Sequence, residues 1–157
     1  MSDHADHDDR GQSLTRMAVS ATAHCLTGCA IGEVLGVAIG TVLGWSTFAT
    51  IALAIVLAFL FGYGLTMLPL LRAGLAVGAA IPLALASDTL SIATMEVVDN
   101  LILLVIPGAM DAGLADGLFW ASLAVALAVA FVAAVPVNRY LIARGRGHAV
   151  VHRFHGH

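Results

Sequence analysis

Residues 23–43 read AHCLTGCAIGEVLGVAIGTVL, and this stretch predicts the fold class. It is apolar over about the 20 residues that an α-helix needs to cross a bilayer. Three further stretches have the same character: residues 48–71, residues 73 through the 90s, and residues 118–141. The whole chain is 60% hydrophobic and 11% charged, whereas a soluble domain carries about 25% charged residues. The sequence therefore predicts an all-α polytopic membrane protein with about four transmembrane helices in contact with the lipid bilayer.

The third hydrophobic region, residues 73–110, is longer than one crossing requires. A straight helix of that length would extend about 55 Å. Pro82 and Pro107 interrupt its apolar pattern, and the polar stretch SDTLSIATMEVVDN lies at residues 87–100. We therefore expect an interrupted or kinked third span, followed by a partly re-entrant segment at residues 101–106.

The placement of arginine predicts the orientation. All seven basic residues are arginines, and with four spans they fall on one side: Arg10, Arg16, Arg72, Arg139, Arg144, Arg146 and Arg153. Basic residues are enriched in cytoplasmic segments, so we expect both termini in the cytoplasm. The expected organisation is an acidic, His-bearing tail at 1–22, a transmembrane domain at 23–143 and an Arg/His-rich tail at 144–157.

Five glycines of the first span recur every four residues: Gly28, Gly32, Gly36, Gly40 and Gly44. Small residues at this spacing let two helix backbones approach closely. The partner is either another span of this chain or the same helix of a second subunit. The second alternative predicts a homo-oligomer.

The same helix carries Cys25, Cys29 and Glu33 at intervals of four, so these side chains share one face. Thiolates favour copper(I) and zinc, and His24 and Glu33 shift the preference toward zinc or iron. Cys25 and Glu33 are about 12 Å apart along the axis, too far to complete one site. The alternative is that the cysteines are small packing residues and Glu33 is a neutral, hydrogen-bonded packing residue.

A second polar stripe lies in the third region and contains Asp88, Ser91, Met95 and Asp99, with Glu96 and Asn100 beside it. Oxygen ligands with one thioether suit a divalent cation or a proton relay, and the alternative is a set of helix caps. We expect Glu33 to face protein or a water-filled cavity near groups such as Asp88. With an unbroken third span Asp99 lies well beyond Glu33 toward the outside, which favours a path across the membrane over one compact site.

The motif HC-x-x-G-C-x-x-G-E at residues 24–33, with SDTLSIATMEVVDN and IPGAMDAG downstream, carries a resemblance. It resembles an uncharacterised bacterial family of small integral membrane proteins, known only as a domain of unknown function. The similarity extends from about Ala23 to Val135. It implies a bacterial inner (plasma) membrane and supplies no activity.

The leading hypothesis is a membrane protein that binds or transports a copper- or zinc-like cation. Its candidate metal ligands are His24, Cys25, Cys29, Glu33, Asp88, Glu96 and Asp99. The alternative is an oligomeric structural or accessory protein assembled through the glycines, and a third hypothesis is a thiol redox protein. Because no P-loop, nucleophile elbow or zincin motif is present, we do not expect an enzyme. The Arg-rich C-terminal segment is typical of a membrane border facing anionic lipid and indicates no nucleic-acid partner.

Overall fold

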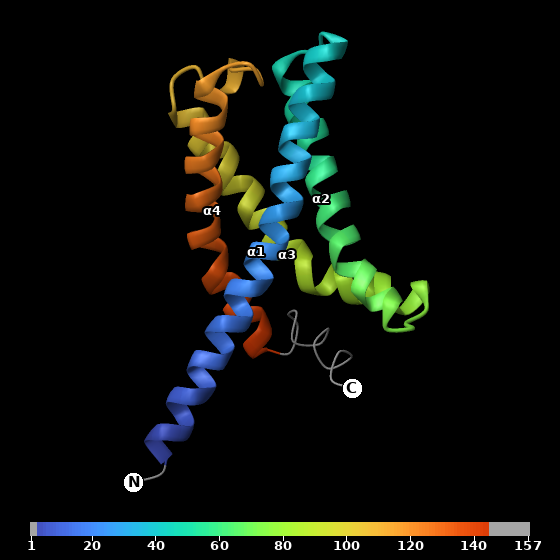
Figure 1. The fold of residues 1–157 in the computed structure, drawn as a ribbon, viewed down its shortest axis with the longest axis vertical. Helices are drawn as coiled ribbons and strands as arrows, with labels where there is room; N and C mark the ends of the chain where they lie inside the picture. Colours follow the sequence, from blue (N-terminus) through green and yellow to red (C-terminus); the bar gives the residue numbers. More distant parts are fainter. Residues whose placement is uncertain (1–2, 145–157) are drawn as a thin grey trace.

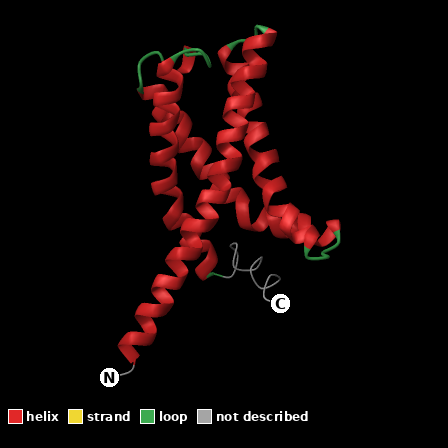
Figure 2. Ribbon diagram, viewed as in Figure 1, coloured by secondary structure: helices red, strands yellow, loops and turns green. Residues whose placement is uncertain are grey.

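The computed structural model describes residues 3–144, and the side chains of residues 11–144. All regular secondary structure in this range is helical (Figure 2): α1 (Asp3–Leu43), α2 (Thr47–Arg72), α3 (Val77–Val105), the short 3-10 helix η1 (Ala109–Asp111) and α4 (Gly117–Ala143). Four segments are long and apolar enough to cross a membrane: Gly11–Leu43, Thr47–Arg72, Val77–Val105 and Gly117–Ala143. The predicted all-α fold with about four transmembrane helices is confirmed.

The first helix is longer than the sequence predicted. α1 begins at Asp3, so most of the segment expected as a tail at 1–22 is helical, and no helix ends at the expected boundary after residue 22. Its 41 residues correspond to about 60 Å, about twice the thickness of a hydrocarbon core. Figure 1 shows the N-terminal part of α1 projecting beyond the other helices. Most of the expected tail at 144–157 lies outside the described residues.

The third region is a bent helix without an interruption. α3 continues through Val105, so residues 101–105 form its last turns and the expected re-entrant segment at 101–106 is wrong. In Figure 1 the light-green beginning of α3 runs across the protein before its yellow part rises beside α4. Pro82 lies in the first part, where it lacks the N–H that would bond to the carbonyl of Gly78. The excess length is therefore absorbed by a bend.

The glycine face of α1 packs against α2, the helix with which α1 makes its most extensive contact. A Cβ atom placed on Gly36 would lie 2.5 Å from the Cα of Ala54, and one on Gly28 would lie 2.7 Å from the Cα of Gly62. Gly32 makes the same kind of contact with the backbone of Ala58, and Gly40 lies against the side chain of Thr50. We call this contact the glycine seam. Its partner is a span of the same chain.

Gly44 does not belong to the glycine seam, and its predicted packing role is wrong. Its φ is 63°, and nothing lies within 4 Å of the position that a Cβ would take. A positive φ is readily adopted only by glycine. Gly44 therefore turns the chain after α1 instead of packing against α2.

The outer surface is suited to lipid. Large apolar side chains point outward all along the helices, among them Phe48, 83% exposed, Val105, 77%, and Val132, 71%. The two ends differ in character. One end, formed by the last turns of α2 and α4, carries Arg72, Arg139 and Arg144, and the other carries Trp45, Asp111, Asp116 and Trp120. Tryptophan is enriched at membrane interfaces, so the chain has the outer surface of a membrane protein.

Candidate functional site

The ionisable residues of α1 and α3 meet inside the helical domain. The two helices run in the same direction (Figure 1), so successive residues of one face successive residues of the other. All six side chains concerned are at most 8% exposed. We call them the polar seam: Cys25, Cys29 and Glu33 of α1 with Asp88, Glu96 and Asp99 of α3. The face that carries this chemistry is therefore turned inward, away from lipid.

Three carboxyl groups form the centre of the polar seam. Glu33, Glu96 and Asp99 are close enough to interact electrostatically with one another, and the thiol of Cys29 donates a hydrogen bond to Glu96. Within the described part of the chain, Oε2 of Glu96 and Oδ1 of Asp99 are buried without a hydrogen-bond partner. We call Glu33, Glu96 and Asp99 the carboxyl cluster. It offers buried acceptors that the surrounding side chains do not satisfy.

The cluster corrects the expected register of the two polar stripes. For an unbroken third span Asp99 was predicted well beyond Glu33 toward the outside, whereas in the bent α3 the two carboxyl groups interact. The bend of α3 explains the difference, because the beginning of this helix runs across the protein and gains little membrane depth (Figure 1). Asp88, expected beside Glu33, interacts with Cys25 instead. The sequence therefore identified the stripes but misaligned them.

A hydrogen-bonded group lies on the other side of the thiols. The side-chain amide of Asn138 in α4 donates to the hydroxyl oxygens of Thr22 and Ser91, both at 2.8 Å. Thr22 in turn donates to the carbonyl of Ala18 at 2.7 Å, and Ser91 is hydrogen-bonded to Cys25. We call Asn138, Thr22 and Ser91 the amide bridge. One side chain thus joins α1, α3 and α4.

Asn138 is the residue of this region that the sequence analysis missed. It is 3% exposed, although it stands next to Arg139 at the end of an apolar span, where an amide is expected at the membrane border. The sequence does show that Asn138 is an isolated amide in a span with few other polar side chains, and this could have indicated a buried position. An amide inside an apolar region must find partners, and in this fold they come from two other helices.

A cavity of about 420 Å³ connects the carboxyl cluster with the tryptophan-bearing end. Its walls include Glu33 as well as Trp45, Asp111 and Asp116 near the connections between helices. Since Glu33 lies within the last third of α1 and Asp111 lies in the connection from α3 to α4, the cavity extends from that connection into the domain. The expectation that Glu33 faces protein and a cavity is confirmed.

The candidate metal ligands do not come together at one point. Among the described side chains, no three His, Cys, Asp or Glu residues are close enough together to hold one metal ion. Cys25 and Cys29 are buried free thiols, and His24 is half-buried on the neighbouring part of α1. The structure therefore offers a row of donors along the helices in place of a chelating centre for a resident copper or zinc ion.

Comparison with known proteins identifies a family without an assigned activity. A family model described as "Domain of unknown function (DUF4396)" matches residues 15–147, which include the polar seam and the amide bridge. No curated protein and no solved structure is significantly similar to the chain. The predicted relation to an uncharacterised family is confirmed.

Proposed function

The chain belongs to the DUF4396 family, and from the chemistry of its site we propose that it transports a metal cation of the copper or zinc class across a membrane. The observation that carries the proposal is the carboxyl cluster with its two unpaired buried oxygens. Buried polar groups are costly unless they are paired, and ionisable groups at membrane depth are typical of ion pathways. A crossing cation would find compensating negative charge at this point.

The order of groups supports a path through the protein. A cation in the cavity would first meet Asp111 and Asp116, then Glu33 and the carboxyl cluster, and then the thiol of Cys29. Carboxylates attract cations in general, whereas thiols select soft and borderline ions such as copper(I) and zinc. Conduction also requires that each site binds weakly enough to release the ion. A row of partial sites meets that requirement better than a full coordination shell.

The amide bridge supplies a closed end for this path. Asn138 holds α1 and α3 together beyond Cys25 by hydrogen bonds to Thr22 and Ser91. Passage of an ion would require at least one of these bonds to open. Access from the cavity side and closure at the bridge are what a transporter needs when it faces one side at a time.

The two other hypotheses have less support. Assembly through the glycines requires a free glycine face, but Gly28, Gly32, Gly36 and Gly40 are covered by α2. A redox pair requires the thiols to reach each other, and residues four apart on a helix are usually too distant for a disulfide. The proposal therefore depends neither on self-association nor on thiol oxidation.

We also propose that the protein lies in a bacterial inner membrane with both termini in the cytoplasm. Arg72, Arg139 and Arg144 lie at one end of the domain, and cytoplasmic borders are the basic ones. The cavity then opens toward the periplasm. A reporter that works only in the cytoplasm should be active when fused to the C-terminus, whereas a reporter that works only in the periplasm should be inactive there. Activity of the periplasmic reporter would mean that the cavity opens toward the cytoplasm.

Uptake into vesicles tests the transport proposal. The purified protein, reconstituted with a zinc- or copper(I)-sensitive dye inside, should raise the dye signal above that of empty vesicles. Glu96→Gln should reduce the uptake rate by about tenfold or more, because the loss of a compensating charge at membrane depth exceeds about 1.4 kcal/mol. Glu96→Asp, which keeps the charge, is the matched control and should retain most of the rate.

The thiols provide an independent arm of the same experiment. Cys25→Ser and Cys29→Ser should each remove most of the preference for copper(I) or zinc over magnesium. The double variant should add little to either single one, because groups that act on one ion are not additive. Wild-type uptake equal to that of empty vesicles would refute transport. A preference for copper(I) or zinc over magnesium that is unchanged by Cys29→Ser would refute the soft-ion assignment.

A further inference from the structure

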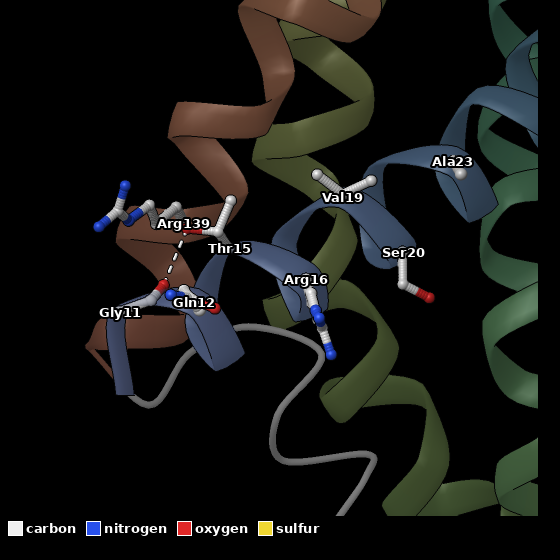
Figure 3. A pocket seen from close by; sticks show the side chains of 8 residues that line it. All are labelled: Gly11, Gln12, Thr15, Arg16, Val19, Ser20, Ala23 and Arg139. Carbon is white, nitrogen blue, oxygen red and sulfur yellow. Dashed lines mark hydrogen bonds between the residues drawn. The ribbon is translucent and has the colours of Figure 1, made fainter. Parts of the chain in front are cut away.

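A second pocket lies at the arginine-bearing end, between α1 and α4. It has a volume of about 640 Å³, and none of the polar-seam residues lines it. Figure 3 shows Arg16 of α1 and Arg139 of α4 on either side of Gln12 and Thr15. Both arginines line the pocket, and their guanidinium groups point in different directions, that of Arg139 away from Arg16.

The pocket changes from polar to apolar along α1. Gln12 and Arg16 come first, at the beginning of the candidate span Gly11–Leu43. Val19, which is 40% exposed, and Ala23 follow on the same side of the helix, further into the span. A ligand with a charged head and an apolar chain matches this sequence of surfaces.

We propose that this pocket binds one anionic phospholipid, with Arg16 and Arg139 at its headgroup and an acyl chain along Val19 and Ala23. Guanidinium groups donate two parallel hydrogen bonds to phosphate oxygens, a geometry that lysine cannot reproduce. Gln12 adds a neutral donor one turn before Arg16, and Ser20 adds another between Val19 and Ala23. The hydroxyl of Thr15 is already committed, since it donates to the carbonyl of Gly11 at 2.9 Å.

Two other arginines with described side chains, Arg144 and Arg72, do not share this arrangement. Arg144 lies over the ring of Tyr140, 4.8 Å from its centre, and so makes a contact within α4 and its end. Arg72 ends α2 at the same side of the domain, but it does not line the pocket. Arg72 is therefore the control that separates a defined lipid site from general attraction between a basic surface and an anionic membrane.

Native mass spectrometry of the full chain in detergent tests the proposal. Delipidated protein is titrated with phosphatidylglycerol and, separately, with phosphatidylcholine of the same chain length. We expect one phosphatidylglycerol to bind with clear preference over phosphatidylcholine. Arg16→Gln and Arg139→Gln should each weaken binding by about fivefold, the contribution expected of one arginine near an anionic lipid. Arg72→Gln should leave the affinity unchanged.

Two further measurements complete the test. The first separates binding of the whole lipid from binding of its headgroup alone, and the second separates loss of the site from misfolding of a variant. Inorganic phosphate and glycerol phosphate should compete poorly, because neither fills the apolar half of the pocket. Equal competition would assign the pocket to a soluble anion and overturn the proposal, as would equal weakening by Arg72→Gln. If a glutamine variant does not fold, Arg16→Lys should still bind phosphatidylglycerol but more weakly than wild type, and wild-type affinity in that variant would contradict recognition of the headgroup by the guanidinium group of Arg16.

Discussion

α1 serves two contacts of opposite character, the glycine seam toward α2 and the polar seam toward α3. In the glycine seam, Gly36 meets Ala54 so closely that no side chain fits between the backbones. In the polar seam, the side chains are large and ionisable, and Glu96 and Asp99 keep unpaired oxygens. Close backbone contact favours rigidity, whereas unsatisfied groups are available to a ligand. The comparison indicates that packing of the glycine seam against α2 fixes where α1 presents its polar side chains to α3.

The two seams are adjacent as well as different. Cys25 and Gly28 are separated by about 60° around the helix, and both thiols belong to the core cluster that also contains Ala58 of α2. The side chain of Ile92 of α3 is fully buried, and its Cδ1 atom lies where a side chain on Gly62 would begin. A shift of α1 against α2 would therefore move Cys29 and Glu33 relative to Glu96 and Asp99.

The largest effect is expected from breaking the glycine seam. Gly36→Leu should destabilise the protein by about 3 kcal/mol or more, because a side chain must separate two backbones as well as overpack the interior. Denaturant titration in mixed micelles, followed by circular dichroism, measures this. Ile39→Leu, on the exposed side of the same turn, should change stability by less than about 0.5 kcal/mol. Equal effects of the two changes would remove the structural role of the seam.

Neutralising a carboxyl group of the polar seam should reduce transport without reducing stability. Asp99→Asn should reduce metal uptake by about tenfold or more, yet leave the unfolding midpoint unchanged or higher. The reason is that the amide keeps the size of the side chain and removes one of three neighbouring acidic groups. Uptake and thermal unfolding measured on the same preparation test both statements. A variant that loses stability in proportion to uptake would show that Asp99 is a packing residue.

The amide bridge should contribute an intermediate amount. Asn138→Leu removes two interhelical hydrogen bonds and should cost about 1 to 2 kcal/mol, since such bonds in membranes average about 0.6 kcal/mol and the hydroxyls lose their partner. Asn100→Leu is the matched control, because the amide of Asn100 donates only to the backbone carbonyl of Glu96 in its own helix, at 2.9 Å. Similar losses for both would contradict a bridge between helices.

Much of this arrangement is visible in the sequence because it follows from helical periodicity. The apolar length predicted the spans, and the four-residue spacing predicted that Cys25, Cys29 and Glu33 share one face. The partner of the glycines also has a signal in the sequence. Small residues recur every four positions in α2, at Ala54, Ala58, Gly62 and Thr66, and all of them are buried.

The pairing between stripes was not accessible in the same way. Whether Glu33 meets Asp88 or Asp99 depends on the path of α3 through the bilayer, and the bend of that helix is a tertiary feature. Asn138 presents a similar difficulty, because one amide near a membrane border has no periodicity to reveal its inward direction. Periodicity identifies faces, whereas depth and register are decided by packing between helices.

A final comparison concerns the point where α1, α2 and α3 meet, at Gly28, Gly62 and Ile92. Gly28→Ala should cost about 1 to 3 kcal/mol, the range for overpacking, because its Cβ would lie 2.7 Å from the Cα of Gly62. Gly62→Ala should change stability by less than about 1 kcal/mol, since its Cβ meets side-chain atoms of Ile92, at 2.5 Å from the terminal Cδ1, and the gain of about 1 kcal/mol in helix propensity offsets the adjustment.

The same unfolding titration measures both glycine variants, and their difference is the informative quantity. A terminal methyl group can rotate away, whereas the backbone of α2 can yield only by moving the whole helix. Ile92→Val in the Gly62→Ala background should restore any lost stability, because it removes the Cδ1 atom that the new Cβ meets. If Gly62→Ala is as destabilising as Gly28→Ala and Ile92→Val gives no rescue, then the two glycines form one symmetric contact and α3 takes no part in it.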